Sequence, residues 1–229
     1  MQKKDQTLFE EQIAYHFRRK ELLKQAFTHS SFANEMKIHK WESYERLEFL
    51  GDAVLEMVSS EFLYGLYPEK PEGELSKIRA SLVCEPSLAF CARQLGLEEF
   101  ILLGRGEECT GGRQRDSIIS DVMEAVIGAL FLDGGIDAAK TYIMKYVLSD
   151  LDEKRLFYDA KSILQEHVQK HPEQGTLSYV LLKEEGPDHD KSYEVQAMIG
   201  SQAYEIGTGR SKKAAEQQAA YKTLLSMNA

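Results

Sequence analysis

A run of apolar residues near the middle of the chain most constrains its fold. In DVMEAVIGALFLDGG, which begins at Asp121, every residue from Val122 to Leu132 except Glu124 is apolar or glycine. This pattern predicts a helix that is buried on nearly all sides. Asp121 and Glu124 are unexpected there, because carboxylates are almost never fully buried without a compensating partner.

Composition limits the class of protein. The 229 residues are 43% hydrophobic, which is ordinary for a globular protein. No apolar run is long enough for a signal peptide or a membrane span, so we expect a cytoplasmic protein. Cys84, Cys91 and Cys109 form no CxxC pair, which indicates free thiols in a reducing compartment rather than disulfides or a zinc site.

The net charge of -9 is unevenly distributed. Residues 1–152 contain 18 Lys and Arg against 26 Asp and Glu, whereas residues 153–229 contain 10 against 11. A net negative charge argues against nucleic acid as a partner. If the acidic part nevertheless binds a polyanion, metal cations must lie between its carboxylates and that polyanion.

Apolar periodicity predicts two domains. Residues 5–152 show helical spacing almost throughout, with a polar loop over 104–116. Residues 159–229 read as a helix, three strands and a helix, because SYEVQAMI alternates and Ser211 suits the N-cap of the last helix. We predict a mainly α protein: an all-helical domain over 1–152, a linker over 153–158 and an α-β-β-β-α domain over 159–229.

Acidic residues form a stripe on the helix that contains ERLEFLGDAVLEMV. At roughly 100° per residue its acids fall within an arc of roughly 80°; they are Glu45, Glu48, Asp52 and Glu56. Such a stripe is often a solvated face. Here, however, few lysines or arginines lie at i+3 or i+4 to offset the repulsion.

We expect the side chains of the two acids in the apolar helix to point to the same side of that helix. Asp121 and Glu124 are spaced i and i+3, and Gly128 leaves room beside them for another backbone or an ion. Either basic side chains compensate them, Arg113 and Arg115 being the nearest candidates, or they bind metal. Carboxylates on two helices, without histidine or cysteine, suit Mg²⁺ or Mn²⁺ rather than zinc. Paired ions of this kind hydrolyse phosphodiesters.

These motifs resemble bacterial ribonuclease III, the double-strand-specific endoribonuclease. ERLEFLGDA matches the family signature, and the similarity extends through AFTHSSF, PEGELSKIRASLV, the segment from GRGEEC to LFLDGG and the whole second unit. The resemblance implies an all-helical endonuclease domain followed by a double-stranded RNA-binding domain.

The resemblance also implies site residues. The metal ligands are Glu48, Asp52, Asp121 and Glu124, of which Asp52 and Glu124 are the least dispensable for catalysis. Glu45 and Glu72 match two further acidic positions that line the cleavage valley, although Glu72 also suits the start of a helix.

Phe49 resembles the family residue that inserts into a pocket on a second subunit, with ordinary core packing as the alternative. In such a homodimer each site cuts one strand and leaves 5′-phosphates, 3′-hydroxyls and short 3′ overhangs.

The second unit resembles a module that reads the shape of duplex RNA. Gln165, Glu166 and Gln169 match contacts to one minor groove, and His189 in GPDHDK matches the contact to the next. Lys212 and Lys213 begin the last helix, where charge and helix dipole both favour phosphates. The alternative for these lysines is a solvated, alanine-rich helix.

Other residues carry weaker signals. We expect His29 to cap or pack, and Trp41 and Tyr44 to be structural. Many family members have asparagine at position 44, which puts a supporting role for Tyr44 in doubt. Arg113 and Arg115 suit either phosphate contact or loop solvation.

The sequence thus favours a cytoplasmic, homodimeric endoribonuclease that needs Mg²⁺, for which Mn²⁺ substitutes, and that cleaves double-stranded RNA, processing ribosomal RNA precursors and other structured transcripts. One rival is an RNA-binding protein with an inactive nuclease fold, which the six acidic positions oppose. Another is a phosphohydrolase acting on nucleotides, which the appended RNA-binding unit opposes.

Overall fold

The chain divides into two compact units, residues 1–149 and 150–229, each with its own core. The computed structural model describes residues 6–149, 160–186, 191–209 and 211–227. The predicted linker at 153–158 and His189 lie outside the described residues. No helix of the described chain is long and apolar enough to cross a membrane.

The first unit consists of helices. Its α-helices are α1 (Gln6–Ile13), α2 (Lys20–Ala26), α3 (Ser30–Glu35), α4 (Glu45–Leu66), α5 (Glu72–Leu82), α6 (Glu85–Gln94), α7 (Arg105–Cys109) and α8 (Asp116–Tyr146). Short 3₁₀ helices are η1 (Lys40–Glu42), η2 (Leu97–Glu99) and η3 (Gly112–Gln114). The predicted loop at 104–116 was therefore wrong in part, because it contains α7 and η3.

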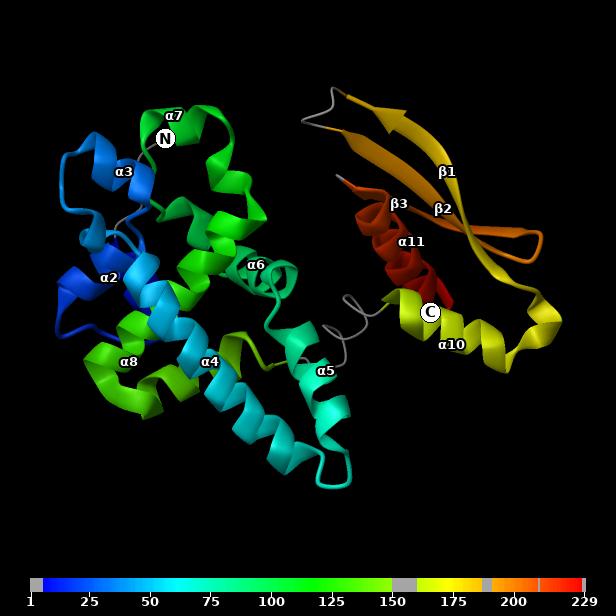
Figure 1. The fold of residues 1–229 in the computed structure, drawn as a ribbon, viewed down its shortest axis with the longest axis horizontal. Helices are drawn as coiled ribbons and strands as arrows, with labels where there is room; N and C mark the ends of the chain where they lie inside the picture. Colours follow the sequence, from blue (N-terminus) through cyan, green and yellow to red (C-terminus); the bar gives the residue numbers. More distant parts are fainter. Residues whose placement is uncertain (1–5, 150–159, 187–190, 210, 228–229) are drawn as a thin grey trace. The chain divides into compact units, whose positions relative to one another are not determined.

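Helix α8 forms the centre of this unit, with α4, α6 and α2 packed against it (Figure 1). Eleven residues from Ile118 to Leu130 are buried, as the apolar run predicted, whereas Leu132 at the end of the run is 44% exposed, so the predicted burial was wrong there. Gly135 has a φ of 75°, which residues other than glycine rarely adopt, and this conformation kinks the helix. The kink divides α8 into two helical segments.

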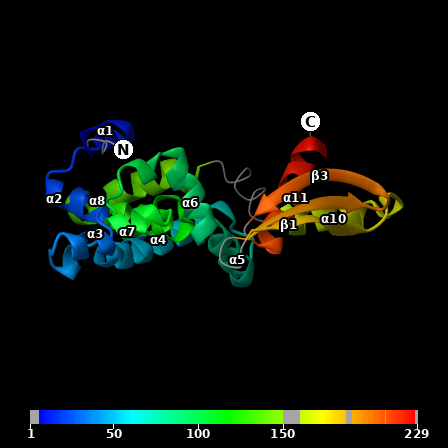
Figure 2. The ribbon, with the colours of Figure 1, turned by 90° about the horizontal axis from the view of Figure 1, so that it is seen from above.

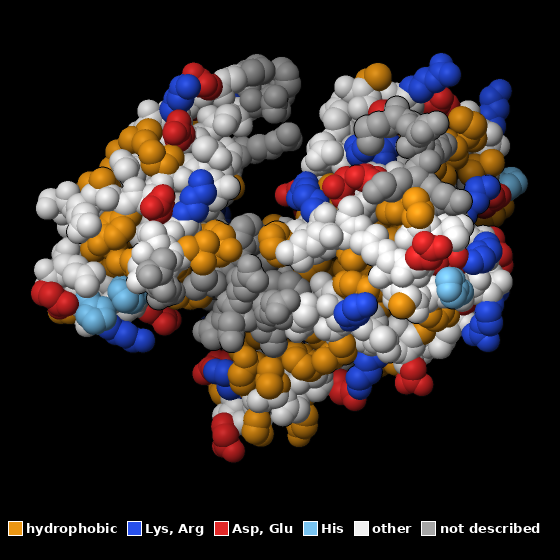
Figure 3. All heavy atoms as spheres, turned by 180° about the vertical axis from the view of Figure 1, so that it is seen from behind, with side chains coloured by type: hydrophobic (Ala, Val, Ile, Leu, Met, Phe, Trp, Pro, Cys, Tyr) orange, Lys and Arg blue, Asp and Glu red, His pale blue; other side chains and the backbone are white. Residues whose placement is uncertain are grey.

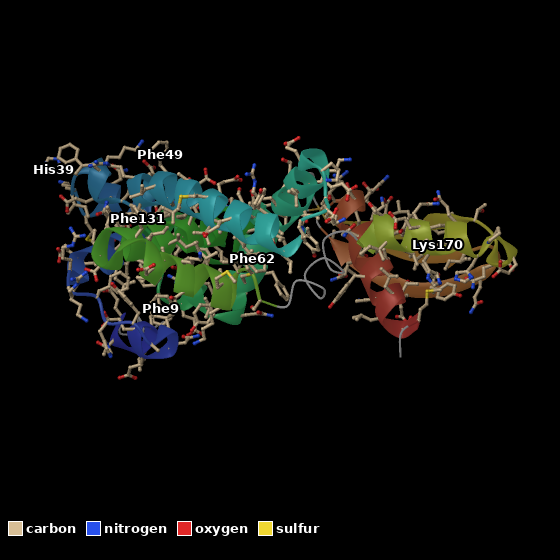
Figure 4. All side chains as sticks on the ribbon, turned by 90° about the horizontal axis from the view of Figure 1, so that it is seen from below. Phe9, His39, Phe49, Phe62, Phe131 and Lys170 are labelled. Carbon is tan, nitrogen blue, oxygen red and sulfur yellow. The ribbon has the colours of Figure 1, made fainter. Side chains whose placement is uncertain are left out.

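An aromatic cluster closes the end of the unit near α1. Phe9 lies edge-on to Phe27, with ring centroids 5.2 Å apart, and Phe27 stacks on Phe100 at 5.5 Å. Figure 4 shows Phe9 beneath α8, where it joins α1 to the rest of the core. The backbones of Thr28 and Leu102 form a bridge beside this cluster.

The second unit has the predicted α-β-β-β-α order. Its elements are α10 (Ala160–Lys170), the 3₁₀ helix η4 (Pro172–Gln174), β1 (Leu177–Glu185), β2 (Ser192–Ile199), β3 (Gln202–Gly209) and α11 (Lys212–Met227). The strands form an antiparallel sheet in the order β1-β2-β3, and the two helices pack against it (Figure 2). Val195, Ala197 and Ile199 are buried, which confirms the predicted alternation. Ser211 Oγ accepts a hydrogen bond from the backbone N–H of Ala214 at 3.2 Å, which confirms the predicted N-cap of α11.

Candidate active site

Two glycines bring the backbones of α4 and α8 into contact. A Cβ atom at Gly51 would lie 1.8 Å from the carbonyl oxygen of Glu124, and one at Gly128 would lie 2.2 Å from the carbonyl oxygen of Leu47. The room that the sequence predicted beside the α8 acids is thus filled by another backbone. The close approach places the acids that flank Gly51 on α4 beside those of α8.

The carboxylates at this crossing interact electrostatically. Burial raises the pKa of Glu48 to about 7, with repulsion from Asp121 and from acids of α4 as the next causes. Burial also raises the pKa of Glu124 to about 8, followed by repulsion from Asp52 and Asp121. Repulsion from Asp52 and Asp121 thus acts on both Glu48 and Glu124, and these four acids form one cluster.

Basic residues neutralise only the ends of the acidic stripe on α4. Lys40 Nζ lies 3.6 Å from Glu45 Oε2, and Arg79 Nε lies 2.8 Å from Glu56 Oε2. Across the described ranges, no lysine or arginine forms an ion pair with the four clustered acids named above. The negative charge is therefore concentrated in the middle of the crossing.

The two arginines considered as partners of the α8 acids are engaged elsewhere. Arg113 Nε donates to Glu108 Oε1 at 2.8 Å, and Arg115 Nη1 lies 2.8 Å from Glu107 Oε1. Basic compensation from these residues is thus not what the structure provides.

The donor set suits a hard cation. Glu48, Asp52, Asp121 and Glu124 offer only carboxylate oxygens, the ligands that Mg²⁺ and Mn²⁺ prefer. Among the residues that the structure describes, no three side chains of His, Cys, Asp or Glu are already gathered into a metal-ion cage.

Tyr44 reaches the cluster from the residue before α4. Its side chain is buried, and its hydroxyl donates a hydrogen bond to Asp121 Oδ2 at 3.1 Å. Burial and the negative charge of Asp121 raise the pKa of the Tyr44 phenol well above its usual value. No sequence pattern signals this contact, because the two residues are 77 positions apart and share no helical spacing.

His29 is a capping residue, as predicted. Its Nδ1 accepts a hydrogen bond from the backbone N–H of Ser31 at 3.0 Å and so caps α3. Burial lowers the pKa of His29. Its ring lies 5.6 Å from that of Tyr44, centroid to centroid, so it packs beside the cluster without entering it.

Glu72 lies apart from the cluster. It begins α5 and lines a cavity of about 500 Å³ between α4 and α5, where its Oε1 accepts a hydrogen bond from Ser76 Oγ at 2.8 Å. Glu72 is not among the charges that act on Glu48, Asp121 or Glu124. Within one chain, the structure therefore gathers four of the six predicted acids, with Glu45 at the edge.

Phe49 lies on the outer side of α4, away from α8 (Figure 4). Its side chain is 81% exposed, so the alternative of ordinary core packing was wrong. Met57 and Tyr64, spaced eight and seven residues further along, are 53% and 77% exposed. These three residues form an apolar stripe along one face of α4.

The predicted RNA contacts of the second unit that the structure describes lie at its surface. Gln165, Glu166 and Gln169 lie on α10, and Lys212 and Lys213 are exposed at the start of α11. The Lys212 ammonium is 3.8 Å from a carboxylate oxygen of β1. Figure 3 shows side chains of both charges on the face it presents, interspersed with hydrophobic ones.

The fold and the site define a class of protein: an all-helical domain that gathers carboxylates at a helix crossing, joined to an α-β-β-β-α domain of the double-stranded RNA-binding type. Residues 19–151 match the family model described as Ribonuclease-III-like, and residues 160–227 match the double-stranded RNA binding motif. The chain belongs to the ribonuclease III family, which confirms the predicted family and fold class.

Curated relatives extend over nearly the whole chain. Ribonuclease 3 of Bacillus licheniformis is 48% identical over 218 residues, which cover 94% of this chain and 87% of the relative. Ribonuclease 3 of Caldanaerobacter subterraneus is 49% identical over 221 residues, covering 95% and 96%. The crystal structure of the ribonuclease III nuclease domain from Campylobacter jejuni matches with a TM-score of 0.58 at 44% identity, covering 63% of this chain and 94% of that one.

Proposed function

We propose that this protein is a divalent-metal-dependent endoribonuclease that hydrolyses double-stranded RNA. The observation that carries the proposal is the cluster of carboxylates at the α4–α8 crossing, which no lysine or arginine of the described residues neutralises. The chain belongs to the ribonuclease III family and carries a double-stranded RNA binding motif. We therefore infer that double-stranded RNA is the substrate of this cluster.

In the proposed mechanism, Glu48, Asp52, Asp121 and Glu124 hold Mg²⁺, for which Mn²⁺ substitutes. When bound, such ions lower the pKa of the attacking water and stabilise the leaving oxygen. Water adds to phosphorus, the bond to the 3′ oxygen breaks, and that oxygen takes up a proton. The products therefore carry 5′-phosphate and 3′-hydroxyl ends.

The protein contributes a fixed geometry to this reaction. The glycine contact between α4 and α8 sets the spacing of the four ligands, and the buried remainder of α8 keeps them in place. Glu45 and Glu72 are proposed to line the valley that receives the RNA.

RNA binding is proposed to rest mainly on the second unit. Gln165, Glu166 and Gln169 would enter a minor groove, and His189 the next. Lys212 and Lys213 would contact the intervening phosphates from a helix N-terminus. Phosphate contacts by Arg113 and Arg115 would require them to leave the carboxylates that they now bind.

A homodimer is the proposed active form. An 81% exposed phenylalanine on α4, continued by the apolar stripe, is a surface that a second copy would cover. A similar structure, the ribonuclease III nuclease domain of Campylobacter jejuni, is described as flexible in a region involved in dimer formation. Two sites related by a two-fold axis would each cut one strand and leave short 3′ overhangs. Sedimentation velocity of the full chain measures this assembly directly.

The proposed substrates in the cell are ribosomal RNA precursors and other structured transcripts, in the cytoplasm. The three cysteines are not joined by a disulfide, which suits a reducing compartment.

A labelled, perfectly paired RNA duplex tests the activity. In Mg²⁺ the unaltered protein should cut the duplex, and in Ca²⁺ it should bind without cutting. Glu124→Gln and Asp52→Asn should each abolish cutting while duplex binding in Ca²⁺ survives, because the second unit binds the duplex independently. Glu61→Gln is the matched control, since Glu61 lies on α4 but pairs with Lys140 outside the cluster.

Three outcomes separate the rivals. Binding without cutting in Mg²⁺ indicates an RNA-binding protein with an inactive nuclease fold. Hydrolysis of mononucleotides in preference to the duplex indicates a nucleotide phosphohydrolase. Normal turnover by Glu124→Gln contradicts the assignment of the site.

A further inference from the structure

Tyr44 is placed to orient one carboxylate of the cluster. Its side chain is 4% exposed, and its hydroxyl donates to Asp121 Oδ2 at 3.1 Å. An ionised carboxylate only accepts hydrogen bonds, and a buried phenol hydroxyl needs an acceptor. Because this bond occupies Oδ2, the other oxygen of Asp121 stays available for a ligand.

The Tyr44 side chain does not cap its own helix. It occupies the N-cap position of α4, yet its side chain forms no capping hydrogen bond. Asparagine or serine at an N-cap typically stabilises a helix by about 1 kcal/mol relative to a residue that does not cap. The side chain instead crosses to α8, so its contact serves the acidic cluster rather than the start of the helix.

Contacts of its backbone and its ring hold Tyr44 in place. Its backbone N–H donates to the carbonyl oxygen of Thr28 at 2.8 Å, and its ring packs against His29. The His29 ring is fixed in turn, because Nδ1 accepts from the backbone N–H of Ser31. Ser31 Oγ accepts a hydrogen bond from the backbone N–H of Gly104 at 2.9 Å, which connects the start of α3 to the segment before α7.

We propose that Tyr44 is a positioning residue that orients Asp121 for a divalent cation. The inference rests on the proposed function, since it takes Asp121 to be a metal ligand. The phenol restricts rotation of the carboxylate and presents Oδ1 to the ion. Removal of a group that hydrogen-bonds to a metal ligand typically lowers metal affinity or activity by about 10–100-fold.

Tyr44→Phe tests the inference because it removes the hydroxyl and keeps the ring. The readout is the affinity for Mn²⁺ and Mg²⁺ without RNA, measured by isothermal titration calorimetry. We expect affinity to fall by about tenfold or more, while the KM for duplex RNA stays unchanged and high Mg²⁺ restores cutting. A purely structural contact would not produce this pattern.

Tyr15→Phe is the matched control. The Tyr15 hydroxyl donates to Asp133 Oδ2 at 2.8 Å, so the substitution removes the same kind of bond from a carboxylate outside the cluster. It should leave the affinity for Mn²⁺ unchanged. The melting temperature of both ion-free variants shows how far each bond supports the fold itself.

A second measurement combines Tyr44→Phe with Asp121→Asn. If the hydroxyl acts through the carboxylate, Tyr44→Phe should have no further effect on ion affinity in the Asp121→Asn background. Fully additive effects would overturn the inference. So would an unchanged ion affinity in Tyr44→Phe.

Failure of the metal site itself is recognised separately. If Asp52→Asn combined with Glu124→Gln binds Mn²⁺ as well as the unaltered protein does, the proposed metal site is wrong. If that double variant loses the ion but Tyr44→Phe retains full affinity, only the role of Tyr44 is wrong.

Discussion

Among the acids of the cluster, Glu48 and Glu124 are those whose pKa values are raised most by their surroundings. Burial is the main cause in both, and it raises their pKa values to about 7 and about 8 from an ordinary value of 4.5. Neighbouring carboxylates add to the effect at each residue. Without a cation, ionisation of either side chain therefore works against the folded state.

The pH dependence of stability follows from this sign. A carboxyl whose pKa is raised by folding supports the fold below its unfolded value of 4.5, and this support is lost as pH rises through about 8. We expect the ion-free protein to lose thermal stability over that range. Glu124→Gln should melt at a higher temperature than the unaltered protein at pH 8, with a smaller difference at pH 5.

Differential scanning calorimetry in a chelating buffer measures this effect. Glu21→Gln is the control, because Glu21 is exposed on α2 outside the cluster. Added Mg²⁺ should reduce the advantage of Glu124→Gln at pH 8, since the ion neutralises the cluster only where its ligands are intact. A pH-independent difference between the two proteins would contradict the assigned pKa shift.

At the scale of elements, the crossing of α4 and α8 creates the site. Neither helix carries all four acids of the cluster by itself, and each needs a glycine at the point where the backbones meet. The contact also accounts for the lack of a polar face on α8 between Val122 and Leu130, because α4, α6 and α2 pack against α8. The same packing that buries the apolar run holds its two acids beside those of α4.

Gly128→Ala should separate the two helices. The added Cβ would lie 2.2 Å from the carbonyl oxygen of Leu47, so one backbone must move. We expect the free energy of unfolding to fall by about 1–3 kcal/mol, as for overpacked cores, and the affinity for Mn²⁺ to fall with it. Urea unfolding and calorimetry measure the two quantities.

Gly65→Ala is the control on α4. A Cβ at Gly65 would have no neighbour within 4 Å, so alanine should stabilise the helix by up to about 1 kcal/mol. Equal destabilisation by both substitutions would show that helix propensity, not the crossing, decides the outcome.

At the scale of the whole molecule, charge is divided between the units. The nuclease unit carries most of the negative charge, and the RNA-binding unit is nearly neutral. Under the proposed function, affinity for RNA comes from a few well-placed side chains and, in the nuclease unit, from bound cations. Modest affinity of the second unit alone is the expected consequence.

Lys212→Ala combined with Lys213→Ala should weaken duplex binding in Ca²⁺ and flatten its dependence on salt. The log–log slope should decrease by about one for each phosphate that the variant no longer binds. Lys24→Ala combined with Lys183→Ala removes the same total charge from α2 and β1 and serves as the control. An unchanged slope in the first variant would remove the proposed role of the two lysines.

Local patterns in the sequence predicted much of the fold. The apolar run predicted the buried helix α8, the alternation of SYEVQAMI predicted β2, and Ser211 predicted the start of α11. These features depend on neighbouring residues along one helix or strand, so periodicity is enough. The predicted polar loop was wrong where α7 and η3 form, because single short turns leave little periodic signal.

Residue type and spacing were enough to predict the helical class, the two-domain order and the acids available for a site. Three features could be read only from the folded chain: which acids meet, that Arg79 and Lys40 neutralise the ends of the stripe, and that Tyr44 reaches Asp121. Those interactions join residues on different elements of the fold. They depend on how closely two helices approach, which is fixed by the glycines at their crossing.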